Sequence, residues 1–311
     1  MKPVHASLIT KDSMHFTQQC IDLQSLIEKT EGVPSGFCDL DLITGGFKPG
    51  ELVVIAGRPS VGITDFARNI IEHVATGTGA KYLGSVLIFS LNTNKELFVF
   101  NLILSFAKLN PHSLKKDDQG RIVNTLQFQS GLELLNNANV FVDDTADISV
   151  QELCIKAREL KAEQELGLII IDDFQCMSSS SELESRFHEL HEISRLLKSL
   201  AKELKVPIIV LSQLERRVEK RHDKKPKLSD LRKYGALEQY SDLILFITRD
   251  AAYCSTCHRR NFRDSEGHNN SVVVKDFADV IVAKNRQGAV GEAYLAFNPF
   301  DLTPMFVPVL T

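Results

Sequence analysis

The stretch that most constrains the fold is GRPSVGIT, which occupies residues 57–64. A phosphate-binding loop has the pattern G-x-x-x-x-G-K-[ST] and lies between a buried strand and a helix. Both glycines and the final threonine, Thr64, fit this pattern. The run LVVIA before the loop is typical of a strand, and DFARNIIEHVA after it has apolar residues at helical spacing. One position departs from the pattern, because Ile63 stands where lysine is expected.

Length and composition bound the class of protein. A chain of 311 residues with 43% hydrophobic content can bury a large core, as one large α/β domain or two small ones. The net charge of −4 excludes a globally basic nucleic-acid binder, so any contact with DNA must come from a local patch.

The sequence contains no sign of export or of a membrane partner. No apolar run approaches the roughly 18–20 residues that a bilayer span requires. The first 30 residues lack a basic start followed by an apolar core and a cleavage site. Six scattered cysteines are typical of a reducing compartment. We therefore expect a cytoplasmic protein.

Apolar runs alternate with helical patterns along most of the chain. Strands are expected at 52–57, 85–91, 139–144, 167–173, 206–213, 242–248 and 280–285, with a long helix within 181–203. Continuous apolar strands separated by helices predict an α/β fold, with a mostly parallel twisted sheet covered by helices on both faces. The last strands have no helix between them, so that edge is open to antiparallel pairing.

Three segments fall outside this alternation. Residues 1–31 form an N-terminal extension in which 14–30 has the pattern of an amphipathic helix, and 32–311 is expected to be the domain. Residues 214–235 are charged, with more basic than acidic side chains, and 251–271 are polar and contain Cys and His. Both of the later segments follow strand ends, where sites of open α/β sheets form.

The second half of a nucleotide site follows in LGLIIIDDFQ, an apolar strand that ends in acid. This is the Walker B pattern, in which Asp172 would hold Mg²⁺ directly or through water. Thr64 would supply a hydroxyl on the other side of the metal. An acid at a strand end can also simply mark a turn, but the order of the two motifs favours a P-loop NTPase fold.

These motifs belong to a wider likeness. The chain resembles the C-terminal motor domain of the DnaB family of replicative DNA helicases, RecA-like ATPases that form hexameric rings. The likeness runs from about Gly32 to Gly288 and includes GVPSGFCDLDLITGGFKPGELVVIAGRPSVG, the SQL motif, SDLR-x-x-G-x-x-EQ and KNRQG. The family's N-terminal primase-interacting domain is expected to be absent, with a linker-like helix in its place.

The resemblance implies ATP and Mg²⁺ as cofactors. It implies single-stranded DNA, helicase subunits or a helicase loader as partners, and a homo-oligomer (a hexamer) or a mixed ring as the assembly. The nucleotide-binding residues carried over from the loop are Gly57, Arg58, Pro59, Ser60, Val61, Gly62, Ile63, Thr64 and Asp65.

Two catalytic positions depart from the family. Ile63 provides neither the donor nor the charge of the lysine that reaches the β- and γ-phosphates, although backbone N–H groups and the helix N-terminus can still hold phosphate. Asn92 replaces the glutamate that acts on the attacking water, and an amide cannot take a proton near neutral pH. Together they predict a degenerate ATPase.

Two residues are possible substitutes. Asp173 directly follows the Walker B aspartate, where other P-loop ATPases place a water-activating acid. Neighbouring strand residues face opposite sides, so the alternative is a solvated acid at the strand end. Arg58 could replace the lysine, but family members can carry an arginine there together with the lysine.

Other family positions are retained. Gln213 matches the residue that senses the γ-phosphate, and Lys284 and Arg286 match residues that reach a neighbouring subunit's nucleotide as a trans-acting finger. The alternative is that Lys284 and Arg286 were inherited from the family and have no such role here.

The segment that matches a DNA-facing loop contains Arg216, Arg217, Lys220, Arg221, Lys224, Lys225 and Lys227. Interleaved acids leave open a solvated surface instead of a DNA contact.

The sequence C-S-T-C-H at 254–258 is the remaining motif. Haem attachment would require export, and a zinc site that recruits His268 would strain one short loop, so zinc is not expected. A loop with two free thiols fits better.

Three functions remain open. The first is a DnaB-like replication protein with a degenerate nucleotide site, which binds DNA or helicase subunits and hydrolyses ATP weakly or not at all. The second is an active ATP-dependent 5′-to-3′ helicase. The third is an interaction module that binds no nucleotide.

Overall fold

The computed structural model describes residues 32–77, 84–109, 114, 125–181, 185–221, 223–234, 236–249, 277–298 and 305–308. The expected linker-like helix and the C-S-T-C-H loop lie outside these residues, as does the rest of the polar segment 251–271. Among the helices of the described residues, none is both long and apolar enough to cross a membrane.

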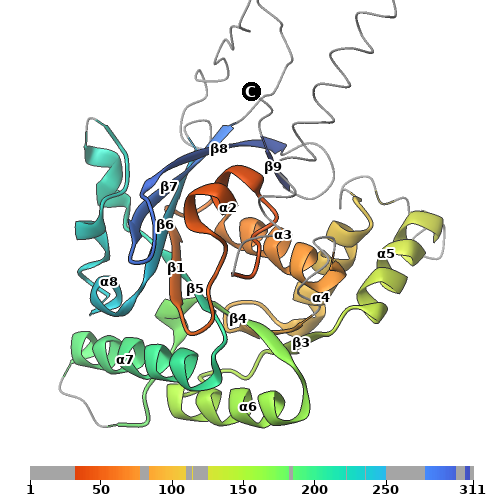
Figure 1. Cartoon of the computed structure of the whole chain (residues 1–311), viewed down its shortest axis with the longest axis horizontal. Helices are drawn as coiled ribbons and strands as arrows, with labels where there is room; N and C mark the ends of the chain where they lie inside the picture. The colour runs from red at the N-terminus through yellow and green to blue at the C-terminus, as the bar shows by residue number, and fades with distance from the viewer. Residues whose placement is uncertain are drawn as a thin grey trace, which may run out of the picture.

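One sheet organises the described chain, with nine strands in the order β3-β2-β4-β5-β1-β6-β7-β8-β9 (Figure 1). The strands are β1 (Leu52–Gly57), β2 (Ser85–Ser90), β3 (Val140–Asp143), β4 (Leu166–Asp172), β5 (Ile208–Gln213), β6 (Leu243–Thr248), β7 (Phe277–Asn285), β8 (Gly291–Asn298) and β9 (Met305–Pro308). Pairing is parallel from β3 to β6 and antiparallel from β6 to β9. The predicted mostly parallel sheet with an antiparallel edge is confirmed, and β8 and β9 are additions to the prediction.

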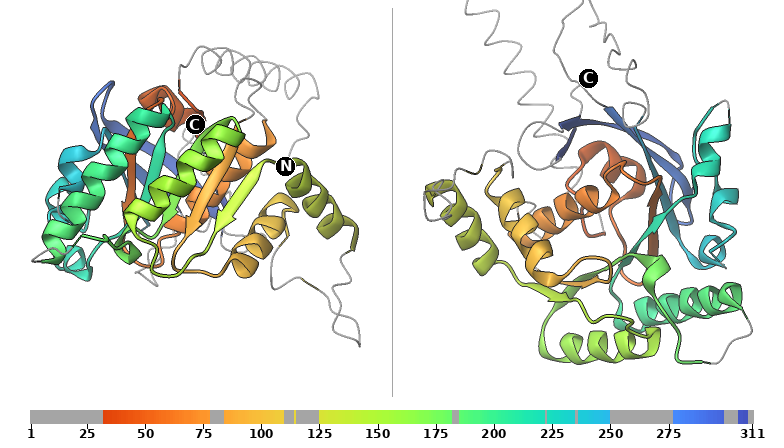
Figure 2. Two further views of the ribbon diagram at one scale, coloured as in Figure 1. Left: turned by 90° about the horizontal axis from the view of Figure 1, so that it is seen from below. Right: turned by 180° about the vertical axis from the view of Figure 1, so that it is seen from behind.

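Helices cover both faces of the sheet, as predicted (Figures 1 and 2). The α-helices are α2 (Cys38–Thr44), α3 (Ile63–Thr76), α4 (Lys95–Phe106), α5 (Thr125–Asn137), α6 (Val150–Glu163), α7 (Arg186–Leu204) and α8 (Leu237–Tyr240). Short 3₁₀ turns are η2 (Phe174–Cys176), η3 (Arg216–Lys220) and η4 (Leu228–Leu231). Helices α2, α3 and α4 pack on one face, and α6 and α7 pack on the other.

The central strand β1 shows why its sequence is apolar without interruption. Alternate side chains of a strand point to opposite faces of the sheet. Val53 and Ile55 accordingly join the core under α3, whereas Leu52, Val54 and Ala56 join the core under α6 and α7. All five are fully buried, because both faces of the sheet are covered.

The beginning of β1 and β6 is fixed by a buried ion pair. Asp242 accepts hydrogen bonds from the Leu52 amide at 2.8 Å and from Lys198 Nζ at 2.6 Å. Lys198, on α7, also donates to the Gly50 carbonyl at 2.8 Å. The two side chains are only 13% and 7% exposed, so the pair ties α7 to the sheet in a place that water barely reaches.

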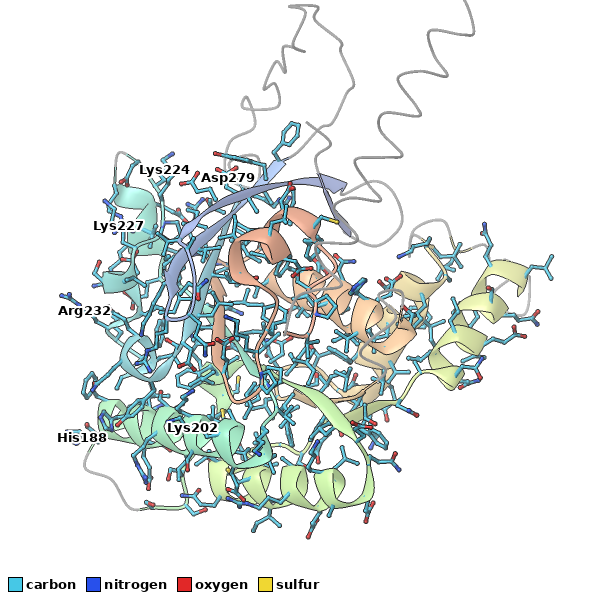
Figure 3. The ribbon with its side chains drawn as sticks, viewed as in Figure 1. His188, Lys202, Lys224, Lys227, Arg232 and Asp279 are labelled. Carbon is cyan, nitrogen blue, oxygen red and sulfur yellow. The ribbon has the colours of Figure 1, made fainter. Side chains whose placement is uncertain are left out.

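We predict that Lys198→Met lowers the free energy of unfolding by about 3 kcal/mol, because removing one partner leaves a buried carboxylate without its main counter-charge. Urea unfolding followed by circular dichroism measures the change. Lys202→Met, at an exposed position of the same helix (Figure 3), is the matched control and is expected to change little. Equal stabilities of the two variants would contradict this account of the pair.

Candidate functional site

A cavity of about 230 Å³ lies at the carboxyl edge of the parallel strands. The carboxyl ends of β1, β4 and β5 meet there, as expected for a site in an open parallel sheet. Its lining comprises Arg58, Pro59, Ser60, Gly62, Ile63, Thr64, Asp65, Asp172, Asp173, Leu211, Ser212 and Gln213. The structure therefore brings together the loop, the Walker B aspartate and Gln213, as the sequence predicted.

The shape of the loop rests on two glycines and on backbone contacts. A Cβ on Gly57 would lie 2.8 Å from the Ile247 carbonyl, and Gly62 has a φ of +94°, which favours glycine. Arg249 Nη1 donates to the Val61 carbonyl at 3.2 Å, and the Leu214 amide donates to the Gly57 carbonyl at 2.7 Å. Helix α3 begins at the loop, so its N-terminal N–H groups face the cavity.

Ile63 fits this loop as an apolar side chain. It is 8% exposed and belongs to the core under α3, although part of it lines the cavity. A Cβ on Gly57 would lie 3.3 Å from Cδ1 of Ile63, so the isoleucine packs against the base of the loop. The position is thus filled and stabilised by apolar contact, and it gives the cavity no cation.

Thr64 and Asp172, the pair expected to hold a metal ion, lie side by side in the lining of the cavity. Thr64 Oγ1 donates to Asp172 Oδ2 at 3.0 Å. Burial raises the pKa of the Asp172 carboxyl, while this hydrogen bond and the positive charge of Arg68 oppose the rise. Two oxygen ligands fit Mg²⁺, which usually keeps several waters and takes one or two protein oxygens. The donor set therefore suits Mg²⁺, the ion that the resemblance implies.

Arg68 is a residue of this region that sequence reasoning missed. It lies one turn after Thr64 on α3 and forms an ion pair with Asp65, which lines the cavity. The spacing of four residues from Thr64 placed it on the same helix face and was a usable signal.

The interpretation of Asp173 as a solvated acid at the strand end was wrong. The residue is 5% exposed and lines the same cavity as Asp172. Strand β4 ends at Asp172, so side-chain alternation does not extend to the next residue. Burial, with a smaller effect of the Asp172 charge, raises the pKa of Asp173 to about 6. Its Oδ1 accepts the Gln175 amide at 3.0 Å and caps η2.

Asn92 and Arg58 lie differently around the cavity. Asn92 is exposed and follows β2 near the end of β4, where the Leu91 amide donates to the Asp172 carbonyl at 2.6 Å. Asn92 does not belong to the cavity lining.

Arg58 lines the cavity but is 2% exposed, and its Nη1 lies 3.6 Å from Glu219 Oε1 in η3. That ion pair holds the guanidinium toward the charged segment.

Lys284 and Arg286 lie away from the cavity of their own chain. Lys284 Nζ donates to the carbonyls of Glu238 and Ser241 at 2.6 and 2.7 Å. Arg286 lies 3.3 Å from Asp242 Oδ1 and is 47% exposed. Because β7 runs antiparallel to β6, both residues reach the amino end of β6, the edge opposite the cavity.

The described residues of the basic segment, 214–221 and 223–234, contact β8 through Lys225, and many of their cations are paired. Lys225 contacts Glu292 of β8 at 2.9 Å, and Lys227 contacts Asp223 at 2.9 Å. Arg217 and Arg221 also pair with nearby acids. In the described residues, Arg216 and Lys224 form no ion pair and are exposed. Lys224 and Lys227 extend away from the sheet in Figure 3.

The pKa of Asp173 gives a test of its environment. Because the folded pKa lies above the ordinary value of 3.8, the folded state takes up a proton more readily than the unfolded state. The resulting stability is fully present below about pH 3.8 and is lost as pH rises through about 6. Asp173→Asn keeps an acceptor for the Gln175 amide and removes this titration.

We therefore predict that Asp173→Asn melts above the native chain at pH 8 and that the difference shrinks toward pH 5. Thermal unfolding in EDTA at several pH values measures it. Asp41, whose pKa burial also raises to about 6, titrates in both proteins and cancels. A difference independent of pH would contradict the raised pKa.

Comparisons with known proteins agree with this architecture. The family model of the DnaB-like helicase C-terminal domain matches residues 32–301. The chain is 40% identical over 272 residues to the replicative DNA helicases DnaC of Bacillus subtilis and DnaB of Geobacillus stearothermophilus. Each alignment covers 86% of this chain and 54% of the relative, so the chain spans about half the length of these relatives.

Two solved structures share the fold. One, described as an ATPase domain, is 31% identical with a TM-score of 0.76, covering 96% of this chain and 98% of that one. A DnaB-like replicative helicase, described with its interactions with primase, is 33% identical with a TM-score of 0.78, covering 90% and 64%. This chain belongs to the DnaB-like helicase C-terminal domain family and has its RecA-like fold.

Proposed function

We propose that this chain acts in DNA replication as a DnaB-like helicase domain whose own nucleotide site hydrolyses ATP weakly or not at all. The observation that carries the proposal is the burial of Ile63 in a loop that is otherwise intact. The hydrogen bond between Thr64 and Asp172 supports a metal-binding role for this pair, and the apolar packing of Ile63 against the base of the loop supports the loss of a phosphate-binding cation.

The remaining groups support binding better than chemistry. Backbone N–H groups of the loop and of the first turn of α3 can hold phosphate without lysine. Mg²⁺, held by Thr64 and Asp172, would neutralise charge on the phosphates. Asn92 is exposed and has no basic site, so it can orient a water but cannot take its proton. This supports retained nucleotide binding with impaired hydrolysis.

An active ATP-dependent 5′-to-3′ helicase is the second candidate, and Asp173 favours it. A buried carboxylate with a pKa of about 6, beside Asp172, has the properties of a proton acceptor near neutral pH. Against this role, one of its oxygens already accepts the Gln175 amide and fixes the turn after β4.

The proposed partners are single-stranded DNA and other helicase subunits or a loader. Arg216 and Lys224 have exposed charges that would contact phosphates. Lys284 and Arg286, on the edge opposite the cavity, would serve the nucleotide of an adjacent subunit in a homo-hexamer or a mixed ring. In a mixed ring, the chain would support an active partner while failing at its own site.

The nucleotide part of the proposal is tested by variants that put back the family residues at positions 63 and 92. We predict that Ile63→Lys binds a non-hydrolysable nucleoside triphosphate about 10- to 100-fold more tightly than the native chain, since a charge-assisted hydrogen bond contributes ~1.5–3 kcal/mol. Isothermal titration calorimetry with Mg²⁺ measures this. Ile63→Met, of similar length without charge, is the control and is expected to show no gain.

Adding Asn92→Glu to Ile63→Lys is expected to restore ATP turnover stimulated by single-stranded DNA. Such turnover in the unmodified chain, abolished by Asp173→Asn, would overturn the proposal in favour of the active helicase. A folded native chain and a folded double variant that both bind no nucleotide would instead favour the interaction module.

DNA binding is tested separately at the exposed cations. We predict that Arg216→Gln with Lys224→Gln weakens single-stranded DNA binding and lowers the slope of log affinity against log salt by roughly 0.7 per lost phosphate contact. Fluorescence anisotropy at several salt concentrations measures both. Lys202→Gln on α7 is the control, and an equal effect there would indicate non-specific attraction only.

A further inference from the structure

The last residues of β5 have no hydrogen-bonded partner in β4. The last residues that pair between these strands are Ile171 and Val210, so the ladder stops before Gln213. On its other side, Gln213 is still paired with Gly57 of β1. The residue that lines the cavity at the end of β5 is thus held by the sheet from one side only.

Gln175 replaces the missing ladder with its side chain. Its Nε2 donates to the Gln213 carbonyl at 2.9 Å, and its Oε1 accepts the Gln213 amide at 3.3 Å. Nε2 also lies 2.9 Å from Ser212 Oγ. One amide therefore satisfies both backbone groups of Gln213, in the way that a neighbouring strand would.

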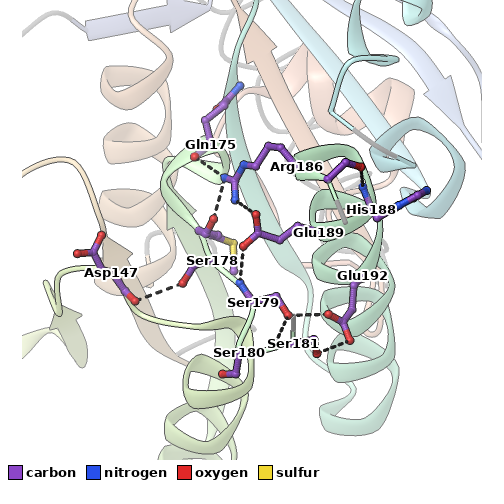
Figure 4. A network of polar contacts seen from close by, with 12 residues as sticks. Asp147, Gln175, Ser178, Ser179, Ser180, Ser181, Arg186, His188, Glu189 and Glu192 are labelled. Atoms are coloured by element: carbon purple, nitrogen blue, oxygen red, sulfur yellow. Dashed lines mark hydrogen bonds and ion pairs between the residues drawn. The ribbon is translucent and has the colours of Figure 1, made fainter. Parts of the chain in front are cut away.

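The backbone of Gln175 is itself held on three sides. Its amide donates to Asp173 Oδ1, and its carbonyl accepts Arg186 Nη2 at 2.8 Å. The adjacent Phe174 is fully buried. Figure 4 shows Arg186 extending from α7 to the turn after β4, with contacts to Gln175 and Glu189. Gln175 is thus presented from a rigid turn and not from a free loop.

We propose that Gln175 is a positioning residue that holds Gln213 at the mouth of the cavity and thereby lets the site distinguish a nucleoside triphosphate from a diphosphate. The inference rests on the proposed nucleotide binding for its ligand. Gln175 acts through Gln213 and touches no phosphate itself. Tyr234 of the basic segment donates to the same Gln213 carbonyl at 2.6 Å, so Gln213 is also linked to that segment.

The first test needs no nucleotide. Gln175→Ala is expected to speed hydrogen exchange in the peptide that contains Gln213, measured by mass spectrometry, while peptides of β1 keep their rates. Gln151 provides a matched control, because its side chain also bridges to Ser179 Oγ and the Ser180 amide, at 3.1 and 3.0 Å, but contacts nothing at Gln213. Unchanged exchange at Gln213 in a folded Gln175→Ala variant would overturn the proposal.

The second test measures discrimination in the Ile63→Lys background. The ratio of the diphosphate Kd to the Kd of a non-hydrolysable triphosphate is expected to fall about tenfold with Gln175→Ala, the equivalent of one to two hydrogen bonds, and to stay constant with Gln151→Ala. Combining Gln175→Ala with Gln213→Ala should add little to Gln213→Ala alone.

The outcomes separate this inference from the proposed function. Equal weakening of both nucleotides by Gln175→Ala would overturn discrimination by Gln175 and leave the site's binding role intact. If Ile63→Lys bound neither nucleotide, nucleotide binding and the discrimination derived from it would both be overturned. The exchange measurement would still decide whether Gln175 holds Gln213.

Discussion

The architecture depends on the complete burial of β1 between β5 and β6. Every apolar side chain of this strand is fully buried, and at its carboxyl end a Cβ on Gly57 would lie 2.8 Å from the Ile247 carbonyl. Glycine at position 57 permits that close approach. The parallel neighbours then bring Asp172 and Gln213 to the same edge, and α3 begins where the loop ends. The position of the cavity is therefore a consequence of strand order and burial, and it does not require a bound ligand.

This origin explains how the loop keeps its shape without the family lysine. The contacts that shape it are hydrogen bonds to its backbone carbonyls, from the Arg249 side chain and the Leu214 amide, and the packing of Ile63 beneath it. None of these depends on a charge at position 63. A phosphate-binding lysine acts mainly on the ligand, whereas isoleucine contributes to the core. Isoleucine at position 63 is thus compatible with the folded shape of the loop.

Most of the sheet and the centre of the site could be predicted because their signals are local. The seven expected strands are present, and the loop and Asp172 meet because parallel strands end at one edge. The antiparallel strands β8 and β9 were missed, since their sequences are more mixed in polarity than those of the buried strands; β8 is stabilised by pairing with β7, and β9 by pairing with β8. Asp173 was assigned the wrong exposure, because strand alternation ends where the strand ends. Gln175 carried no sequence signal, as its role arises only from the gap between the ends of β4 and β5.

The separation of Lys284 and Arg286 from the cavity limits what one chain can do. They lie at the amino edge of β6, and a strand of six residues places the two edges of the sheet roughly 20 Å apart. The intervening strands are fully buried and hydrogen-bonded on both sides, so no side-chain movement can close that distance. Any action of these residues on a nucleotide therefore requires a second subunit. Under the proposed function, a chain that hydrolyses ATP weakly at its own cavity would still serve a neighbouring subunit through this opposite edge.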